Sequence, residues 1–470
     1  MLTVSGEAGS FIPASARTPF WLRSNQYGII PYSMPAATGR LSASLDYDSL
    51  RLATGKLSYG GAINAVANVG ATTQWLLPES YVKFRYGVFE FYAGRRRELF
   101  GLADSTLSTG SYAWSGNALP VPKVQLEIRP FTPLTFTRGF VAVKGSFAHG
   151  WLGGRYVQHT MLHQKSLYVR LGKPNSKWKL YGGVNHQVVW GGYSDDLVKI
   201  GLVKSPYLPS SFKDYLNVVS GLKADATGIV DSLAYANFDL TNRIGNHVGS
   251  VDVAVEFKTD RFIYYAYRQN PYETGAFFRG NSFADGLNGL RIRSTNPNAF
   301  IQQLLIEYLN TANQGGDDFG KGKNGKVNYF NHSQFRDGWS YASMGLGTPF
   351  ITPAYSTTGE LPYGGFSNNN RVQVWHIGLS GTLLKPTRRW LNGPITYQIK
   401  GSFSHNLGTY NAPFANPLNQ FSGIVSFQVP LSYWKGLLLQ TSLSADNGSL
   451  YTNGFGMYVG VRKEWSRRLR

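Results

Sequence analysis

The sequence predicts an all-β fold, a transmembrane antiparallel β-barrel of about 18 strands with short periplasmic turns, long extracellular loops and an occluded lumen. Two observations indicate this class. Apolar and polar residues alternate through most of the chain, which is typical of strands that have one apolar face. The connections between the predicted strands are alternately short and long, as in outer-membrane barrels. We expect residues 1–470 to form a single barrel domain.

The alternation is clearest in 251–258, where Val251, Val253, Val255 and Phe257 alternate with polar or small residues. The same pattern recurs in 82–86, 124–129, 140–147, 166–171, 395–404, 425–429, 437–444 and 455–462. Predicted strands run for about 9–12 residues, the length of a tilted bilayer crossing. Aromatic residues near predicted strand ends are expected to form interfacial girdles. They are Trp190, Tyr193, Trp375, Trp390, Tyr433, Trp434 and Trp465.

The connections set the orientation of the barrel. Short turns are predicted at 130–137, 172–176, 258–261, 294–298, 385–394 and 432–436. Longer connections are predicted at 95–121, 149–162, 190–247, 270–286, 309–369, 406–419 and 446–453. Counting strands with this parity places both termini on the periplasmic side. Within the longer connections, residues 211–220 are predicted to form a short helix with a serine cap. Residues 320–326 are predicted to form a basic hairpin tip, because they lack the Lys-Ser/Thr pair of a phosphate loop.

The amino-acid composition excludes several other classes of protein. The chain of 470 residues is 14% aromatic and only 15% charged, which argues against a disordered protein. Cysteine is absent, so disulfides and cysteine-based zinc sites are excluded. No apolar run approaches the roughly 20 residues of a membrane-spanning helix. The start shows no basic segment followed by an apolar one, so we expect a mature chain whose signal peptide has been removed, in the outer membrane.

Charged residues of both signs are predicted to face the lumen, where pairing across strands would fill the interior. They are Lys83, Arg85, Glu90, Glu127, Arg129, Lys144, Arg170, Asp252, Glu256, Lys258, Arg268, Lys400, Arg462 and Glu464. The long connections 190–247 and 309–369 are expected to fold inward and close the lumen. The competing interpretation is an open porin whose basic lining selects anions.

An ordered set of local motifs resembles the capsule-assembly Wzi family of Gram-negative outer-membrane barrels. The motifs lie at 19–28 (PFWLRSNQYG), 115–123, 149–151, 162–166, 184–192, 245–250, 267–269, 285–290, 331, 338–341 and 347–350. The last hundred residues add only barrel strands. The resemblance implies a lectin with a closed lumen, without cofactor or catalytic activity, that binds capsular or related surface polysaccharide and helps anchor or assemble it.

A saccharide-binding surface needs aromatic faces for the sugar rings and fixed polar groups, and an acidic polymer adds a need for basic residues. The predicted outer loops offer both. The candidates are Arg95, Arg96, Arg97, Trp114, Trp151, Arg155, Tyr156, Tyr272, Phe277, Arg279, Lys321, Lys323, Lys326 and Trp339. The net charge of +20 suits an acidic glycan, and it equally suits the phosphates of lipopolysaccharide. Each aromatic residue could instead serve as an interfacial anchor.

Four histidines fall near predicted outer strand ends. We expect them to join Lys165 and Asp285 in a polar network at the lumen mouth. The histidines are His149, His163, His186 and His247. Metal binding is the alternative, but no two of them have a tight ligand spacing, so no metal site is predicted.

Enzymatic chemistry is not predicted. Asn331, His332 and Ser333 are consecutive, and neighbours in sequence seldom face each other for attack. No Gly-x-Ser-x-Gly elbow occurs. The carboxylate pairs at 195–196 and 317–318 are adjacent in loops, so their side chains diverge. The expected partners are surface polysaccharide, lipid and lipopolysaccharide, not nucleic acid, and the expected state is a monomer. The alternatives are an anion-preferring porin and a barrel scaffold within a larger surface or secretion assembly.

Overall fold

The computed structural model describes residues 1–48, 51, 54–223, 243–273, 282–318, 325–359, 361–362, 365–384, 391–432 and 436–467. Seven residues singled out above lie outside the described part of the chain. They are Phe277, Arg279, Lys321, Lys323, Trp390, Tyr433 and Trp434.

The strands of the first half are β1 (Leu2–Pro13), β2 (Ala36–Leu45), β3 (Ser58–Gly70), β4 (Gln74–Tyr86), β5 (Phe89–Arg95), β6 (Lys123–Pro133), β7 (Val141–Trp151), β8 (Met161–Leu171), β9 (Trp178–Trp190) and β10 (Asn246–Lys258). Those of the second half are β11 (Phe262–Tyr272), β12 (Gly286–Ser294), β13 (Gln303–Asn310), β14 (Ser340–Tyr341), β15 (Met344–Gly345), β16 (Val372–Leu384), β17 (Ile395–Gly408), β18 (Pro413–Leu431), β19 (Leu437–Gly448) and β20 (Gly454–Arg467). The helices are α1 (Phe20–Arg23), α3 (Asp195–Lys199) and α4 (Phe212–Ser220), with 3₁₀ turns η1 (Thr135–Thr137) and η4 (Ala354–Ser356).

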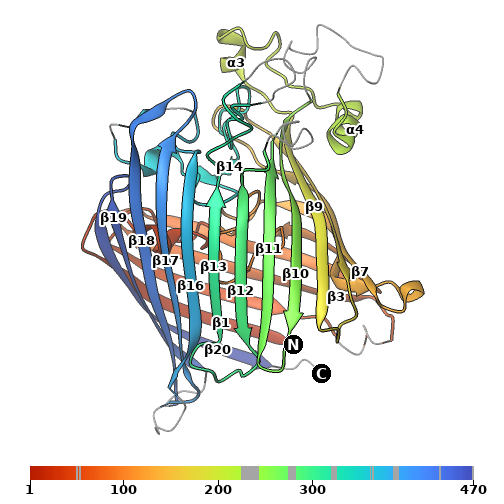
Figure 1. Cartoon of the computed structure of the whole chain (residues 1–470), viewed down its shortest axis with the longest axis vertical. Coiled ribbons are helices and arrows are strands. Elements are labelled where there is room, and N and C mark those ends of the chain that lie inside the picture. Colours follow the sequence, from red (N-terminus) through yellow and green to blue (C-terminus); the bar gives the residue numbers. More distant parts are fainter. Residues whose placement is uncertain are drawn as a thin grey trace.

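The strands form a closed antiparallel barrel (Figure 1). An 18-stranded sheet runs through the chain in order, and β14 with β15 makes a separate small hairpin within a loop. Pairing of β1 with β20 closes the cylinder, in a register that runs from Leu2 opposite Arg467 to Pro13 opposite Gly456. The predicted fold class and strand number are therefore confirmed.

Many of the side chains that point away from the lumen are large and apolar. Ile63, Leu167, Leu180 and Val253 leave 52%, 55%, 53% and 54% of their surface uncovered. A continuous apolar band of this kind costs free energy in water and is stable against lipid. In the described part of the chain, no helix has the length and apolar character needed to cross a membrane.

Two of the predicted girdle residues lie on the outer surface near opposite ends of the strands. Trp375, near the start of β16, is 61% exposed, and Trp465, near the end of β20, is 55% exposed. Two others are corrected. Trp190 is only 3% exposed because it packs against Tyr215 of α4, and Tyr193 follows β9 in a loop where its backbone pairs with Gln158.

The predicted parity of connections is confirmed from β5 onward. Both termini and the short turns lie at the lower end of Figure 1, which corresponds to the periplasmic side. The exceptions are in the N-terminal part, where 71–73 makes a short connection on the outer side and 46–57 a longer one on the periplasmic side. The helix predicted at 211–220 is confirmed as α4, with Ser211 and Asp214 forming a capping box.

A charge placed in the outer apolar band tests the orientation of these strands. Val253 lies near the middle of β10 and faces outward, so Val253→Arg should cost about 2–4 kcal/mol of folding free energy at the bilayer midplane. Reversible urea unfolding in lipid vesicles would measure this loss. Val253→Ala is the matched control and should change stability much less; equal stability of the Arg and Ala variants would contradict the assignment.

Candidate functional site: the plugged outer mouth

The lumen is closed by the connection between β5 and β6, residues 96–122, which we call the plug. From its origin at β5 the plug reaches the opposite wall. There Asp252 of β10 accepts a hydrogen bond from the Leu102 amide at 2.8 Å, and Glu307 of β13 accepts one from the Thr109 amide at 2.6 Å. The ring of His376 on β16 contacts the Leu107 carbonyl at 2.7 Å. The plug therefore crosses the barrel.

The first loop, residues 14–35, also enters the barrel. The Phe20 amide at the start of α1 donates to Asp446 of β19 at 2.8 Å, and the Trp21 indole N–H donates to Ser402 of β17 at 3.1 Å. Phe20 and Trp21 are almost fully buried and share an apolar cluster with Leu107 of the plug. Two separate loops thus fill the interior with one packed core.

The long connection after β13 packs against the plug, as expected for 309–369. The Trp339 indole donates to the Ala113 carbonyl at 2.6 Å, and the Thr348 amide donates to the Tyr112 carbonyl at 3.0 Å. The connection 190–247 was expected to fold inward as well, and this is wrong. Its described helices α3 and α4 lie above the strands (Figure 1), so the lumen is filled by 14–35 and 96–122 instead.

A network of buried charges supports the start of the plug. Glu90 on β5 and Glu127 on β6 face each other across the two strands, and the Arg96 guanidinium lies between them at 2.6 and 2.5 Å. Arg96 and Lys123 also pair with Glu98, at 2.8 and 2.7 Å. Burial alone would raise the pKa of Glu98, but these cations hold it well below its usual range.

Several residues predicted to meet a glycan are buried instead. Arg96 is 8% exposed within the network just described, Trp114 is 5% exposed and Trp339 is fully covered. The Tyr272 hydroxyl donates to the Asn185 carbonyl at 2.9 Å, and its ring stacks on His186. The prediction that these side chains present themselves at the surface is corrected for Arg96, Trp114 and Trp339, because the inward folding of the loops buries them; Tyr272 is partly covered at the end of β11.

Other predicted residues remain accessible at the outer end. Trp151 is 50% and Tyr156 38% exposed, and the exposed Arg155 lies between them on the β7–β8 loop. Asp337 fixes this loop by accepting the Arg155 amide at 2.7 Å. Arg95 and Arg97 are half-buried: Arg95 donates to the Tyr341 hydroxyl at 2.9 Å, and Arg97 pairs with Glu79 at 3.4 Å. Lys326 is exposed at a turn of the long loop, with a φ of 53°.

The four histidines gather beneath α4, on the outward-facing side of their strands. His163 has the same strand parity as the exposed Leu167, and His247 the same as the exposed Val253, so the prediction that these histidines line the lumen mouth is corrected. His186 and His247 are hydrogen-bonded through their rings at 2.9 Å, while His149 and His163 each lie 5.7 Å from the ring of Tyr215. Lys165 donates to the Val219 carbonyl at the end of α4. Asp285 was expected in the same network, but its hydrogen bonds go to Asn313, Gln314 and Tyr329. Among the described residues, no group of three acidic or histidine side chains could hold a metal ion.

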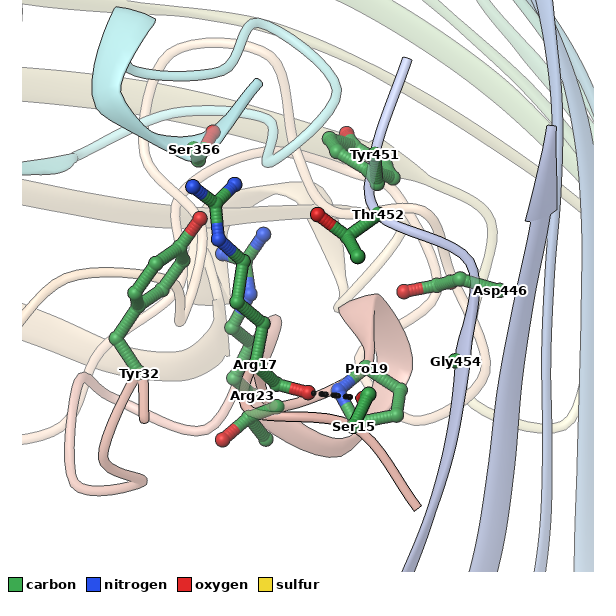
Figure 2. Close-up of a pocket in the computed structure, with 11 residues that line it drawn as sticks. Ser15, Arg17, Pro19, Arg23, Tyr32, Ser356, Asp446, Tyr451, Thr452 and Gly454 are labelled. Carbon is green, nitrogen blue, oxygen red and sulfur yellow. Dashed lines mark hydrogen bonds between the residues drawn. The ribbon is translucent and has the colours of Figure 1, made fainter. Parts of the chain in front are cut away.

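A narrow pocket opens where the first loop meets the last one (Figure 2). The first loop supplies Arg17, Arg23 and Tyr32, the segment around η4 supplies Ser356, and the connection before β20 supplies Tyr451 and Thr452. Figure 2 shows both guanidinium groups pointing into the space between these side chains. We call this the outer pocket.

The local backbone explains why the two arginines converge. Arg17 pairs with Ser33 across a bridge, and the Thr18 amide donates to the Tyr32 carbonyl, so the first loop folds back on itself. Tyr32 then lies between the guanidiniums, 5.7 Å from that of Arg17 and 5.0 Å from that of Arg23. These distances are those of cation–π contacts, which hold a charge without neutralising it.

The two arginines retain unused hydrogen-bonding capacity. The Nε of Arg23 is buried and has no hydrogen-bond partner among the described residues. Arg17 donates one bond, to the Thr357 carbonyl at 3.3 Å. A planar guanidinium with free donors matches a carboxylate or phosphate. Sequence analysis missed Arg17 and Tyr32 entirely and included Arg23 only within the motif at 19–28, although two arginines beside aromatic residues were a visible signal.

Comparisons with solved structures place this barrel among known folds. The chain is similar to Wzi, described as an outer-membrane protein involved in group 1 capsule assembly in Escherichia coli and as a carbohydrate-binding β-barrel, with 12% identity and a TM-score of 0.59 over 99% of this chain and 85% of that one. OprD from Pseudomonas aeruginosa has 9% identity and a TM-score of 0.47 over 99% and 94% of the two chains. OccK5 (OpdH) from the same organism has 7% identity and a TM-score of 0.48 over 99% and 98%.

At these identities the likeness to Wzi is one of fold, the closed outer-membrane type of barrel. A scan against protein-family models found no match, and a search of curated proteins found no relative. These comparisons therefore support the barrel architecture, and the closer family resemblance drawn from the motifs stays a prediction.

The anchoring of the plug can be tested by conductance. We expect the native protein to give no steady large steps in planar bilayers, because 14–35 and 96–122 fill the lumen. Replacing both wall carboxylates, Asp252→Ala with Glu307→Ala, leaves plug amides unsatisfied at about 1–3 kcal/mol each and should produce conducting events. Glu464→Ala, at an exposed strand end, is the control. Steady conductance of the native barrel would contradict the closed lumen.

The plug should also respond to pH through Glu273, which follows β11. It accepts hydrogen bonds from the Tyr112 hydroxyl at 2.7 Å and the Phe330 amide at 3.1 Å, and burial raises its pKa from 4.5 to about 8. The folded loops therefore hold a proton that the unfolded loops release, so this stabilisation is complete below pH 4.5 and is lost as the pH rises through about 8.

Hydrogen exchange would measure this effect at the amides near Tyr112 and Phe330. After correction for intrinsic exchange rates, we expect stronger protection at pH 6 than at pH 9. Glu273→Gln should make the protection independent of pH, and Asp260→Asn, at an exposed turn, should leave the native dependence in place. If the Glu273→Gln variant kept the same pH dependence of protection, a group other than Glu273 would be its cause.

Proposed function

We propose that this protein is a non-enzymatic outer-membrane receptor that binds an acidic surface or capsular polysaccharide and helps anchor or assemble it at the cell surface. The observation that carries the proposal is the outer pocket, where the guanidinium groups of Arg17 and Arg23 converge and the buried Nε of Arg23 has no hydrogen-bond partner among the described residues. A barrel whose interior is packed with chain has its outer mouth as the surface available to an extracellular ligand.

The chemistry of the pocket suits one unit of such a polymer. Guanidinium groups bind carboxylates in two-point geometry, and tyrosine rings stack on the apolar face of a sugar. Tyr355, next to Tyr32 at a ring distance of 5.5 Å, is 51% exposed and extends the aromatic surface outward. The pocket is narrow, so it would meet a charged substituent of the polymer, and the polymer itself would lie across the mouth.

Two further features support the proposal. The net charge of +20 attracts a polyanion from solution. Trp151, Arg155 and Tyr156 provide a second exposed group of aromatic and basic side chains at the same end of the barrel. Wzi, which shares the barrel fold, is described as carbohydrate-binding. The anion-porin alternative differs in one respect that is easily measured, since it requires ion flow through the lumen.

Binding of defined polymers to the purified protein tests the receptor. We expect retention of an acidic polysaccharide, and weak retention of the same polymer after reduction of its carboxyl groups. Arg17→Gln and Arg23→Gln should each lower the affinity about tenfold or more, as expected for loss of a charge-assisted hydrogen bond. Lys199→Gln makes the same charge change on exposed α3 and should leave the affinity nearly unchanged.

Equal losses of affinity in the Arg17, Arg23 and Lys199 variants would show that binding rests on nonspecific charge attraction. Binding of neutral and acidic polymers with the same affinity would contradict recognition through the arginines. Steady conductance with no glycan binding would favour the porin.

A further inference from the structure

A second, narrow cavity lies inside the barrel on the other side of the plug and opens to solvent. Residues 99–101 of the plug form its roof, and β6, β7 and β8 form its wall. The polar side chains that line it are Glu127, Arg129, Lys144, Ser146, Ser166 and Tyr168. We call it the inner cavity.

The inner cavity opens toward the periplasmic end. Strand β6 runs from the outer rim at Lys123 to the periplasmic turn after Pro133. Along it, the exposed fraction of the side chain rises from 1% at Lys123 and 2% at Glu127 to 42% at Arg129. Phe100 of the roof is 7% exposed. Solvent therefore reaches these residues from below the plug and not from the outer mouth.

The charges around the inner cavity do not balance. Glu127 accepts hydrogen bonds from Arg96, Arg129 and Gln125, and Glu98 pairs with Lys123 as well as with Arg96 and Arg129. These carboxylates are thus fully used by the network at the start of the plug. The basic groups that remain are on β7 and β8.

Lys144 and Arg170 are those remaining groups. Lys144 forms no ion pair with any described carboxylate, and the Nε and one Nη of Arg170 are buried without a hydrogen-bond partner in the described part of the chain. In the β7–β8 register Lys144 lies opposite Tyr168, and Arg170 follows Tyr168 by two residues, so both side chains are on the lumen face one step apart. The hydroxyls of Ser146 and Ser166, 2.7 Å from each other, complete this wall.

We propose that the inner cavity binds an anionic group, a phosphate or a carboxylate, of a small solute that enters from the periplasmic side. Lys144, which lines the cavity, and Arg170, which lies one step away on the same face outside the lining, supply the charge. Ser146 and Ser166 supply hydroxyl groups. Two cations held at a partly dehydrated wall without counterions are destabilising, and a bound anion offsets that cost. This site is separate from the outer pocket and does not depend on the proposed receptor function, because the plug lies between the two.

Titration of the full-length barrel in detergent micelles with inorganic phosphate, and separately with glucuronate, tests the site by calorimetry. The background carries Arg17→Gln and Arg23→Gln, so that the outer pocket does not contribute heat. We expect saturable binding of at least one anion. Lys144→Gln and Arg170→Gln should each weaken it about tenfold or more. Arg462→Gln removes a lumen-facing cation that is already paired with Glu464 and should leave the affinity unchanged.

Heat-modifiable mobility on a gel identifies any variant that has not folded, and the conservative Lys144→Arg should retain binding. Phosphate binding alone identifies a phosphorylated solute, and glucuronate binding alone a sugar acid; either supports the site. Absence of binding to both anions, or equal binding in the Lys144, Arg170 and Arg462 variants, overturns it. Loss of polymer binding at the outer pocket with intact anion binding here would refute only the receptor function.

Discussion

The structure depends on carboxylates in the barrel wall that accept hydrogen bonds from backbone amides of irregular chain. Asp252, Glu307 and Asp446 lie on three different strands and receive the amides of Leu102, Thr109 and Phe20. Chain that leaves the sheet and enters a barrel carries amide groups that no strand ladder satisfies, and a buried unpaired amide is costly. These acceptors make it favourable for loops to fill the lumen in place of water.

Filling the lumen divides the molecule into two faces with separate chemistry. The outer face presents Arg17 and Arg23, which are held by contacts with Tyr32 and not by carboxylates. The periplasmic face presents Lys144 and Arg170 beneath the plug. On each face the nearby carboxylates form other contacts. Asp446, which lines the outer pocket, accepts hydrogen bonds from the Phe20 amide and the Ser422 hydroxyl, and near the inner cavity Glu98 and Glu127 pair with Arg96. The surplus positive charge is thus localised by the packing of the interior.

Sequence reasoning predicted the barrel well because alternation is a local property that each strand carries by itself. It failed for Trp114, Trp339 and Arg96, since the direction in which a loop folds depends on partners far away in the chain. Arg96 is buried because Glu90 and Glu127 face each other across β5 and β6, which only the strand register reveals. The length of a loop did not predict which connection enters the lumen. The connection 190–247 is longer than 96–122, but 96–122 is the one whose backbone amides meet carboxylate acceptors on the opposite wall.

The outer pocket shows why a site can be absent from any local pattern. Its residues come from the first loop and from the last, and the contact between Phe20 and Asp446 joins positions 426 residues apart. They meet because β1 pairs with β20, the step that closes the cylinder. Contacts of such large sequence separation form only after the intervening chain has been ordered. Closure of the barrel therefore brings together the two chain segments that form the arginine pocket, and the pocket exists only in a fully closed barrel.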